Sequence, residues 1–263
     1  MVIIVNGAPK TGSTWLRHVI ANMIDYVPIP DPYQNKAWGE IGALRSIAPK
    51  ALKRFLNEED YDLINYISKN HFHGQYELDL LLTFGNSKIF CIERDLKDVV
   101  VSYYYHQLRK GTLDCEFESY YWKYGRFFIQ FMLEYQRVWH VSHPQIYISS
   151  YDALKNNFSE ECYRIAGFLG VSLTEGKIKS IKNATSMESM RKKWGEDAKK
   201  DEKKKFFRKG IIGDWENHFN ETMIQDFLLI SQNGLSGIDF IKYQILYPVR
   251  LRILKEYESL RYR

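Results

Sequence analysis

Cysteine is scarce in this chain of 263 residues: Cys91, Cys115 and Cys162 are widely spaced and odd in number. This pattern excludes a disulfide framework and a cysteine-based zinc site. All apolar runs fall short of the roughly 18 residues that a membrane helix needs. The N-terminus also lacks a basic region followed by a long apolar stretch. We therefore expect no signal peptide, no membrane contact and a cytoplasmic location.

Hydrophobic residues make up 45% of the chain and charged residues 26%, a balance that excludes collagen-like and disordered proteins. The net charge of +5 is unevenly distributed, because residues 191–209 hold ten Lys or Arg and only four Asp or Glu. A locally basic segment favours an anionic ligand over a nucleic-acid-binding surface. We interpret 191–209 either as a solvated loop or as a mobile basic lid drawn down by phosphate charge.

The chain opens with a strand, a glycine-containing turn and a helix. Val2–Val5 is a β-branched run, typical of a strand buried on both faces. The turn 6–12 follows directly. Apolar residues then recur at helical spacing: Leu16, Val19, Ile20, Met23 and Val27. This order is that of the first half of a βαβ unit.

Two further strand–helix units follow. Residues 88–92 form a buried-strand candidate, and a helix over about 96–106 has Asp95 as its N-cap. Residues 146–148 precede another helix, which stops at Gly170. We predict a single α/β domain over 1–263 whose central parallel sheet is flanked by helices. Ligands of such sheets bind beyond the carboxyl ends of the strands. The loops expected to converge there begin at Asn6, Glu93 and Ser149.

The segment Gly7–Thr14 resembles a phosphate-binding Walker A loop, with glycines five residues apart and a strand and a helix on either side. Backbone N–H groups and the helix dipole attract phosphate at such a place. The lysine of this loop is Lys10, whereas Walker A has its lysine where Ser13 stands. A small-molecule P-loop kinase and a glycine turn without ligand stay open as alternatives.

Three segments together resemble the family of cytosolic-type sulfotransferases that use 3′-phosphoadenosine 5′-phosphosulfate (PAPS). Pro9–Leu16 is similar to the 5′-phosphosulfate loop, Arg94–Tyr104 to the 3′-phosphate motif and Arg208–Trp215 to the late RKGxxGDW motif. The resemblance implies a P-loop NTPase-like sulfotransferase fold, PAPS as cosubstrate, adenosine 3′,5′-bisphosphate (PAP) as product, and no metal. A non-catalytic nucleotide-binding protein of the same fold is the remaining alternative.

The resemblance also implies roles for individual residues. The 5′-phosphosulfate would be bound by Lys10, Thr11, Gly12, Ser13 and Thr14. The 3′-phosphate would be bound by Arg94, Ser102, Arg208, Lys209 and Gly210. The adenine would be contacted by Trp15, Tyr151, Thr185 and Met187. Lys10 and Ser102 count among the catalytic residues as well. The alternative for Arg94 is a structural salt bridge with Asp98.

A histidine that removes the acceptor proton is expected about 22 residues before Arg94, often in a Lys-x-His pattern. His71 lies 23 residues and His73 lies 21 residues before it. The pattern selects His71, with Lys69 as a second cation near the transferred group. A histidine pKa near neutrality suits this proton transfer. His73 as the base, and a structural role for both histidines, stay open.

The acceptor is expected to be a small molecule that offers a hydroxyl or an amine. Candidate acceptor-binding residues, chosen by position alone, are Trp38, Glu40, His106 and Phe117. The family's usual dimer motif is not matched at Glu216, Asn220, Glu221 and Gln225, which leaves a monomer or a different dimer. Residues 240–263 are expected to form a C-terminal helical extension, basic and amphipathic, that packs on the body of the protein rather than on a membrane.

Overall fold

The computed structural model describes residues 1–35, 46–59, 61, 64–193 and 207–245. The chain divides into two compact units, each assembled from two separate stretches. The first unit comprises Met1–Arg94 and Arg137–Lys199, and the second comprises Asp95–Gln136 and Lys200–Arg263.

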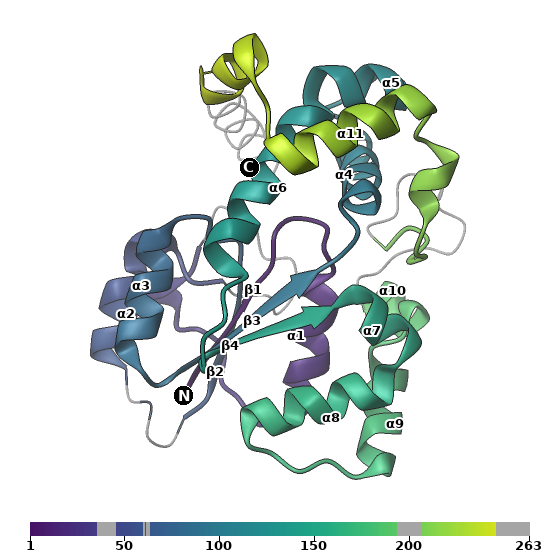
Figure 1. Cartoon of the computed structure of the whole chain (residues 1–263). Coiled ribbons are helices and arrows are strands. Elements are labelled where there is room, and N and C mark those ends of the chain that lie inside the picture. The colour runs from purple at the N-terminus through teal and green to yellow at the C-terminus, as the bar shows by residue number, and fades with distance from the viewer. Residues whose placement is uncertain (36–45, 60, 62–63, 194–206, 246–263) are drawn as a thin grey trace. The chain divides into compact units, whose positions relative to one another are not determined.

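The first unit is built on a parallel sheet (Figure 1). Its strands are β1 (Val2–Asn6), β2 (Tyr66–Asn70), β3 (Ser87–Glu93) and β4 (Ile146–Ser150). They lie in the order β2-β1-β3-β4, and every pair is parallel. The chain leaves β1 toward β2 on one side and returns to β3 on the other. The loop after β1 therefore lies at the point where the strand order reverses, a common ligand site in such sheets.

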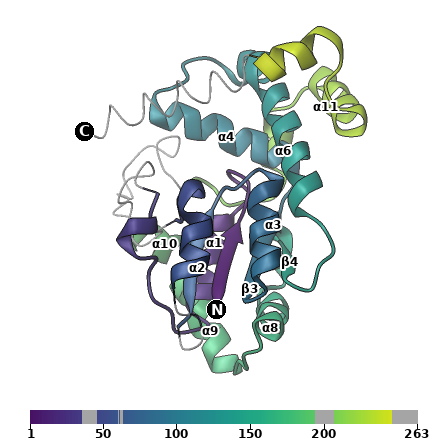
Figure 2. The ribbon, with the colours of Figure 1, turned by 90° about the vertical axis from the view of Figure 1, so that its left-hand side faces the viewer.

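Helices cover both faces of this sheet. The helices of the first unit are α1 (Ser13–Ala21), α2 (Leu52–Glu58), α3 (Gln75–Phe84), α7 (Tyr151–Asn156), α8 (Phe158–Leu169), α9 (Glu175–Ala184) and α10 (Met187–Lys193). Both views place α2 and α3 on one face and α1, α8 and α9 on the other (Figures 1 and 2). Between β1 and α1, α8 and α9 lies an apolar core that includes Val5, Leu16 and Ile165. The predicted α/β class, with its parallel sheet flanked by helices, is confirmed.

Three details of the predicted elements were wrong. The strand β2 was not predicted, so the sequence indicated three strand–helix units where the described sheet has four strands. The first helix ends at Ala21 rather than continuing to Val27, which pairs with Tyr66 beside the sheet and is 39% exposed. The helix after β4 is interrupted at Asn157 and continues as α8, which does end at Gly170 in the left-handed conformation.

The described residues of the second unit form helices joined by loops, with no strand among them. It contains α4 (Leu96–Lys110), α5 (Phe117–Tyr120), a π-helical turn (Tyr121–Gly125), a 3-10 turn (Asp214–Asn217), α11 (Glu221–Asn233) and helical residues 237–245. The helix α6 (Arg126–Trp139) starts in this unit and ends in the first. The part of 240–263 beyond residue 245 lies outside the described residues, as do 194–206 of the predicted lid.

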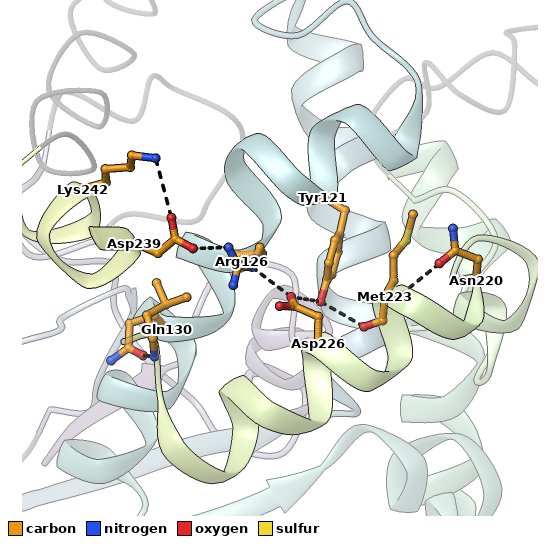
Figure 3. A network of polar contacts seen from close by, with 9 residues as sticks. Tyr121, Arg126, Gln130, Asn220, Met223, Asp226, Asp239 and Lys242 are labelled. Carbon is orange, nitrogen blue, oxygen red and sulfur yellow. Dashed lines mark hydrogen bonds and ion pairs between the residues drawn. The ribbon is translucent and has the colours of Figure 1, made fainter. Parts of the chain in front are cut away.

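Arg126, at the start of α6, forms ion pairs with the C-terminal helices of this unit (Figure 3). Arg126 donates from Nε to Asp226 of α11 at 2.9 Å and also pairs with Asp239. The hydroxyl of Tyr121 donates to Asp226 at 2.9 Å. Arg126 is 20% exposed, so these pairs are partly shielded from water and link α6 to both C-terminal helices.

No helix among the described residues is both long enough and apolar enough to cross a membrane.

Candidate active site

The loop after β1 has the geometry of an anion site. Lys10 has φ +71° and Gly12 has φ +106°, so left-handed residues alternate with ordinary ones and turn successive N–H groups to one side. A Cβ on Gly7 would lie 2.4 Å from the Ser13 Cβ, and one on Gly12 would lie 2.7 Å from the Tyr151 ring. Both glycines are therefore needed for this close turn.

The structure describes no side-chain cap at the N-terminus of α1, the helix that follows the loop. Its N-cap, Gly12, has no side chain to cap the helix, and the first turn of α1 carries no acidic residue. Thr11 is tied into the loop through its hydroxyl, which donates to the Ala8 carbonyl at 2.8 Å, while Ser13 and Thr14 open the helix. The free end of the helix dipole and the Lys10 side chain make this loop suited to a phosphate group.

Arg94, at the end of β3, lies beside this loop. Its guanidinium is 4.2 Å from the centre of the Tyr151 ring, and it donates to the Lys10 carbonyl at 3.4 Å. Tyr151 begins α7 directly after β4. Residues from the carboxyl ends of β1, β3 and β4 therefore meet, as the strand–helix pattern predicted.

Trp15 packs into the same neighbourhood. Its ring makes an edge contact with Tyr151 at 5.5 Å between centroids and a stacked contact with Phe158 at 6.3 Å. The indole Nε1 is buried and has no hydrogen-bond partner among the described residues. Thr185 caps α9 with its hydroxyl bonded to the Ile181 carbonyl, and Met187 begins α10 half-buried. The adenine contacts expected of these residues stay predictions.

His71 follows β2 and is held against the phosphate loop. The side chain of Asn6 fixes the neighbouring backbone, since it accepts from the Phe72 N–H at 2.8 Å and donates to the Phe72 carbonyl at 3.1 Å. The Nδ1 of His71 bonds to the carbonyl of Gly7 within the loop. That bond requires a proton on Nδ1, which leaves the lone pair on Nε2 as the basic position.

Lys69 caps this lone pair, with Nζ 2.8 Å from the His71 Nε2. Burial lowers the pKa of His71 well below its ordinary value, and the charges of Lys69 and Lys10 lower it further. Burial also lowers the pKa of Lys69 to about 8. The imidazole is therefore neutral near physiological pH. His73 is half-buried two residues further on.

The second unit contains the other predicted phosphate-binding residues. Ser102 is half-buried in the middle of α4. Arg208 stacks over the Tyr105 ring at 4.2 Å and pairs with Asp214, to which Lys209 also donates at 2.9 Å. Burial of Asp214 opposes its ionisation, but the two cations prevail and lower its pKa to about 2. Gly210 has φ +63°, which suits glycine.

Asp98 connects α4 to this late segment. Its carboxylate accepts from the backbone N–H of Gly213 at 2.9 Å and of Trp215 at 3.0 Å. Lys97 adds a contact, with Nζ 3.6 Å from the centre of the Trp215 ring.

The candidate acceptor-binding residues are placed only in part. Trp38 and Glu40 lie outside the described residues. The Nδ1 of His106 accepts a hydrogen bond from the Arg109 guanidinium at 3.2 Å on α4. Phe117 is 7% exposed and packs against Tyr104 and Phe219 inside the second unit. Their contact with an acceptor stays a prediction.

Comparison with known proteins decides the family. A family model described as a sulfotransferase domain matches residues 2–239. The chain belongs to this family. This sulfotransferase is 27% identical to Sulfotransferase 1B1 of Mus musculus over 89% of its own length and 83% of that protein. It is 30% identical to Sulfotransferase 6B1 of Danio rerio, over 57% of its own length and 52% of the relative.

Solved structures share the sulfotransferase fold. Mouse sulfotransferase SULT7A1, complexed with PAP, superposes with a TM-score of 0.61 at 21% identity, covering 98% of this chain and 88% of that one. Retinol dehydratase, in complex with androsterone and inactive cofactor PAP, has a TM-score of 0.59 at 17% identity, covering 89% and 80%. These likenesses show the fold over most of the sulfotransferase.

Three polar residues of this sulfotransferase have contacts that the sequence analysis did not anticipate. Asn6 fixes the segment that carries His71, Asp98 binds backbone of the late segment, and Asp214 binds its two cations. All three lie within or next to the segments that suggested the family. Their position in a motif marked them, but only the tertiary structure shows which groups they contact.

Proposed function

We propose that this sulfotransferase transfers a sulfuryl group from PAPS to the hydroxyl or amine of a small-molecule acceptor. The observation that carries the proposal is the hydrogen bond between His71 and the Gly7 carbonyl. This bond holds a neutral histidine beside the loop that suits the donor's phosphate. The acceptor's proton must be removed at the same place, because the acceptor attacks the sulfur attached to that phosphate. The PAP named in the structures of SULT7A1 and retinol dehydratase supports PAPS as the donor.

In this proposal the loop residues bind the donor's 5′-phosphosulfate. The N–H groups of Thr11, Gly12, Ser13 and Thr14, together with Lys10, fit an anion with several oxygens. Trp15, Tyr151, Thr185 and Met187 contact the adenine. Arg94 and Ser102 bind the 3′-phosphate with Arg208, Lys209 and the Gly210 N–H.

The chemistry is an in-line displacement at sulfur. The acceptor oxygen or nitrogen forms a bond to sulfur while its proton passes to the Nε2 of His71. The bond between sulfur and the bridging oxygen breaks, and its electron pair stays on the 5′-phosphate of PAP. Lys10 stabilises the charge that develops on this oxygen, and Lys69 stabilises the sulfuryl oxygens. For His71 to accept the proton, Lys69 must first release its Nε2, a rearrangement that sulfuryl binding by Lys69 would produce.

The proposal is less specific about three properties: the acceptor's chemical class, the cellular compartment and the oligomeric state. We retain a small molecule with a hydroxyl or an amine as the acceptor, and a cytoplasmic location on the sequence pattern alone. Transfer of labelled sulfate from PAPS to a panel of phenols, alcohols and amines would identify the acceptor. Cell fractionation would test the location, and light scattering would distinguish a monomer from a dimer.

Substitution of the two histidines tests the mechanism. We expect His71→Asn to lower kcat by about 10²–10⁴-fold, the usual contribution of a general base, with PAP affinity nearly unchanged. The matched control His73→Asn should keep kcat within about threefold, because the Lys-x-His pattern selects His71 as the base and not His73. Sulfuryl transfer is measured with labelled PAPS, and PAP binding by calorimetry. Full activity of His71→Asn, or its loss in His73→Asn alone, would reject His71 as the base.

A further inference from the structure

Asp98 is a buried carboxylate whose described hydrogen bonds go to a distant segment of the chain. It is 2% exposed and lies in the first turn of α4. An acidic residue there commonly caps its own helix, but Asp95 already does so by accepting from the N–H groups of Lys97 and Asp98. Asp98 instead accepts from Gly213 and Trp215, 115 and 117 residues further along.

The two N–H groups that Asp98 binds lie on either side of Asp214. Asp214 is itself 2% exposed, and its carboxylate binds Arg208 and Lys209. Gly213, with φ +82°, turns the backbone so that both contacts form together. Asp98 therefore fixes the backbone of the residue that in turn holds both cations in place.

Asp98 and Ser102 are four residues apart on α4, and side chains at this spacing lie on the same helix face. The helix that carries Ser102 is thus attached through Asp98 to the segment that carries Arg208, Lys209 and Gly210. All these residues belong to the second unit. In the proposed function, the residues of this unit that contact the 3′-phosphate are Ser102, Arg208, Lys209 and Gly210.

We propose that Asp98 is a positioning residue that sets the preference for a nucleotide with a 3′-phosphate, by holding the late segment against α4. The proposal rests on the proposed function, because it takes Ser102, Arg208, Lys209 and Gly210 as the 3′-phosphate site of this unit. Asp98 itself does not touch the nucleotide. Its loss should leave the 5′-phosphate loop, which belongs to the first unit, unaffected.

The test compares two nucleotides that differ only in the 3′-phosphate. The affinities of PAP and adenosine 5′-monophosphate are measured by calorimetry for the wild type and for Asp98→Asn. The amide keeps the size of the side chain but turns an NH2 group toward one of the two backbone donors. We expect PAP affinity to fall about 10–100-fold, the effect of losing a hydrogen bond to a charged group, with the affinity for the monophosphate within about twofold.

The matched control is Asp239→Asn. This carboxylate also lies in the second unit and pairs with Arg126, but its described contacts are all within the C-terminal helices and α6. It should leave the ratio of the two affinities unchanged. If Asp98→Asn does not fold, Asp98→Glu is measured in the same way, since it keeps the charge but displaces the oxygens. It should lower the ratio as well.

The outcomes separate this proposal from the proposed function. A wild type that binds both nucleotides equally well would overturn the 3′-phosphate site and the role of Asp98 with it. A wild type that prefers PAP, with an equal preference in the Asp98 variant, would overturn the role of Asp98 alone. Equal losses of affinity for both nucleotides would mean that Asp98 supports the fold generally, which also contradicts the proposal.

Discussion

At the residue scale, Lys69 determines how the proposed chemistry depends on pH. Burial lowers its pKa to about 8, so the ammonium loses its proton at a lower pH than an exposed lysine does. His71 is neutral over the same range, because its pKa lies well below the ordinary value. A fall in activity at alkaline pH would therefore come from Lys69 and not from the histidine.

We predict that kcat/KM for PAPS falls as the pH rises through about 8, because only charged Lys69 stabilises the sulfuryl oxygens. In Lys69→Arg the fall should move to higher pH, since a guanidinium stays charged throughout this range. The assay uses an aliphatic alcohol among the acceptors, whose hydroxyl does not titrate here. An unchanged alkaline limb in Lys69→Arg would show that another group controls it.

The sequence indicates individual residues only where the side chain itself carries the chemistry, and their roles stay predictions. Lys10, Arg94 and His71 stand out in the sequence because a phosphate-binding loop needs a cation and a proton transfer needs a base. Asp98 lies in the same motif as Arg94, yet its role depends on the backbone N–H groups of Gly213 and Trp215, which folding brings to it. A carboxylate's partners cannot be deduced from its neighbours in the sequence when they are more than 100 residues away.

At the element scale, β1, β3 and β4 were predictable because their runs of apolar residues are distinctive. The strand β2 was missed because its sequence, Tyr-Ile-Ser-Lys-Asn, is largely polar. Its polar side chains have partners inside the unit: Ser68 accepts from the Ile47 N–H at 3.0 Å, and Asn70 donates to the Ile47 carbonyl at 2.8 Å. These bonds allow a polar strand to be buried, and hydrophobic periodicity cannot reveal them.

The N-cap of α4 was predicted from sequence and is confirmed. Asp95 accepts from the Lys97 N–H at 2.8 Å and the Asp98 N–H at 3.3 Å. We predict that Asp95→Ala lowers the free energy of unfolding by about 1 kcal/mol, the usual cost of losing such a cap.

Asp95→Asn is the control for this prediction, because its side-chain oxygen can still accept from the same N–H groups. It should cost much less than Asp95→Ala in urea denaturation. The ion pair of Asp95 with Lys97, at 3.7 Å and partly exposed, contributes little. Equal destabilisation by both substitutions would assign the effect to that charge rather than to the cap.

At the scale of the whole molecule, the sequence predicted the α/β class and the family, since the motifs are spread over most of the chain. The division into two compact units was not evident. Each unit combines stretches that are far apart in sequence, and no change in composition marks where one ends. Helix α6 passes from one unit to the other without a linker, so a boundary search along the chain has nothing to detect.

The central claim is that this sulfotransferase binds the nucleotide of PAPS, and thermal stabilisation by PAP tests it most directly. A ligand that binds only the native state raises the free energy of unfolding by about 2.7 kcal/mol at 100 times its Kd. The melting temperature is measured with PAP, with ADP and with ATP plus magnesium, for the wild type and for Arg94→Ala. We predict selective stabilisation by PAP, reduced in Arg94→Ala. Stronger stabilisation by ATP with magnesium would contradict the account and favour a kinase.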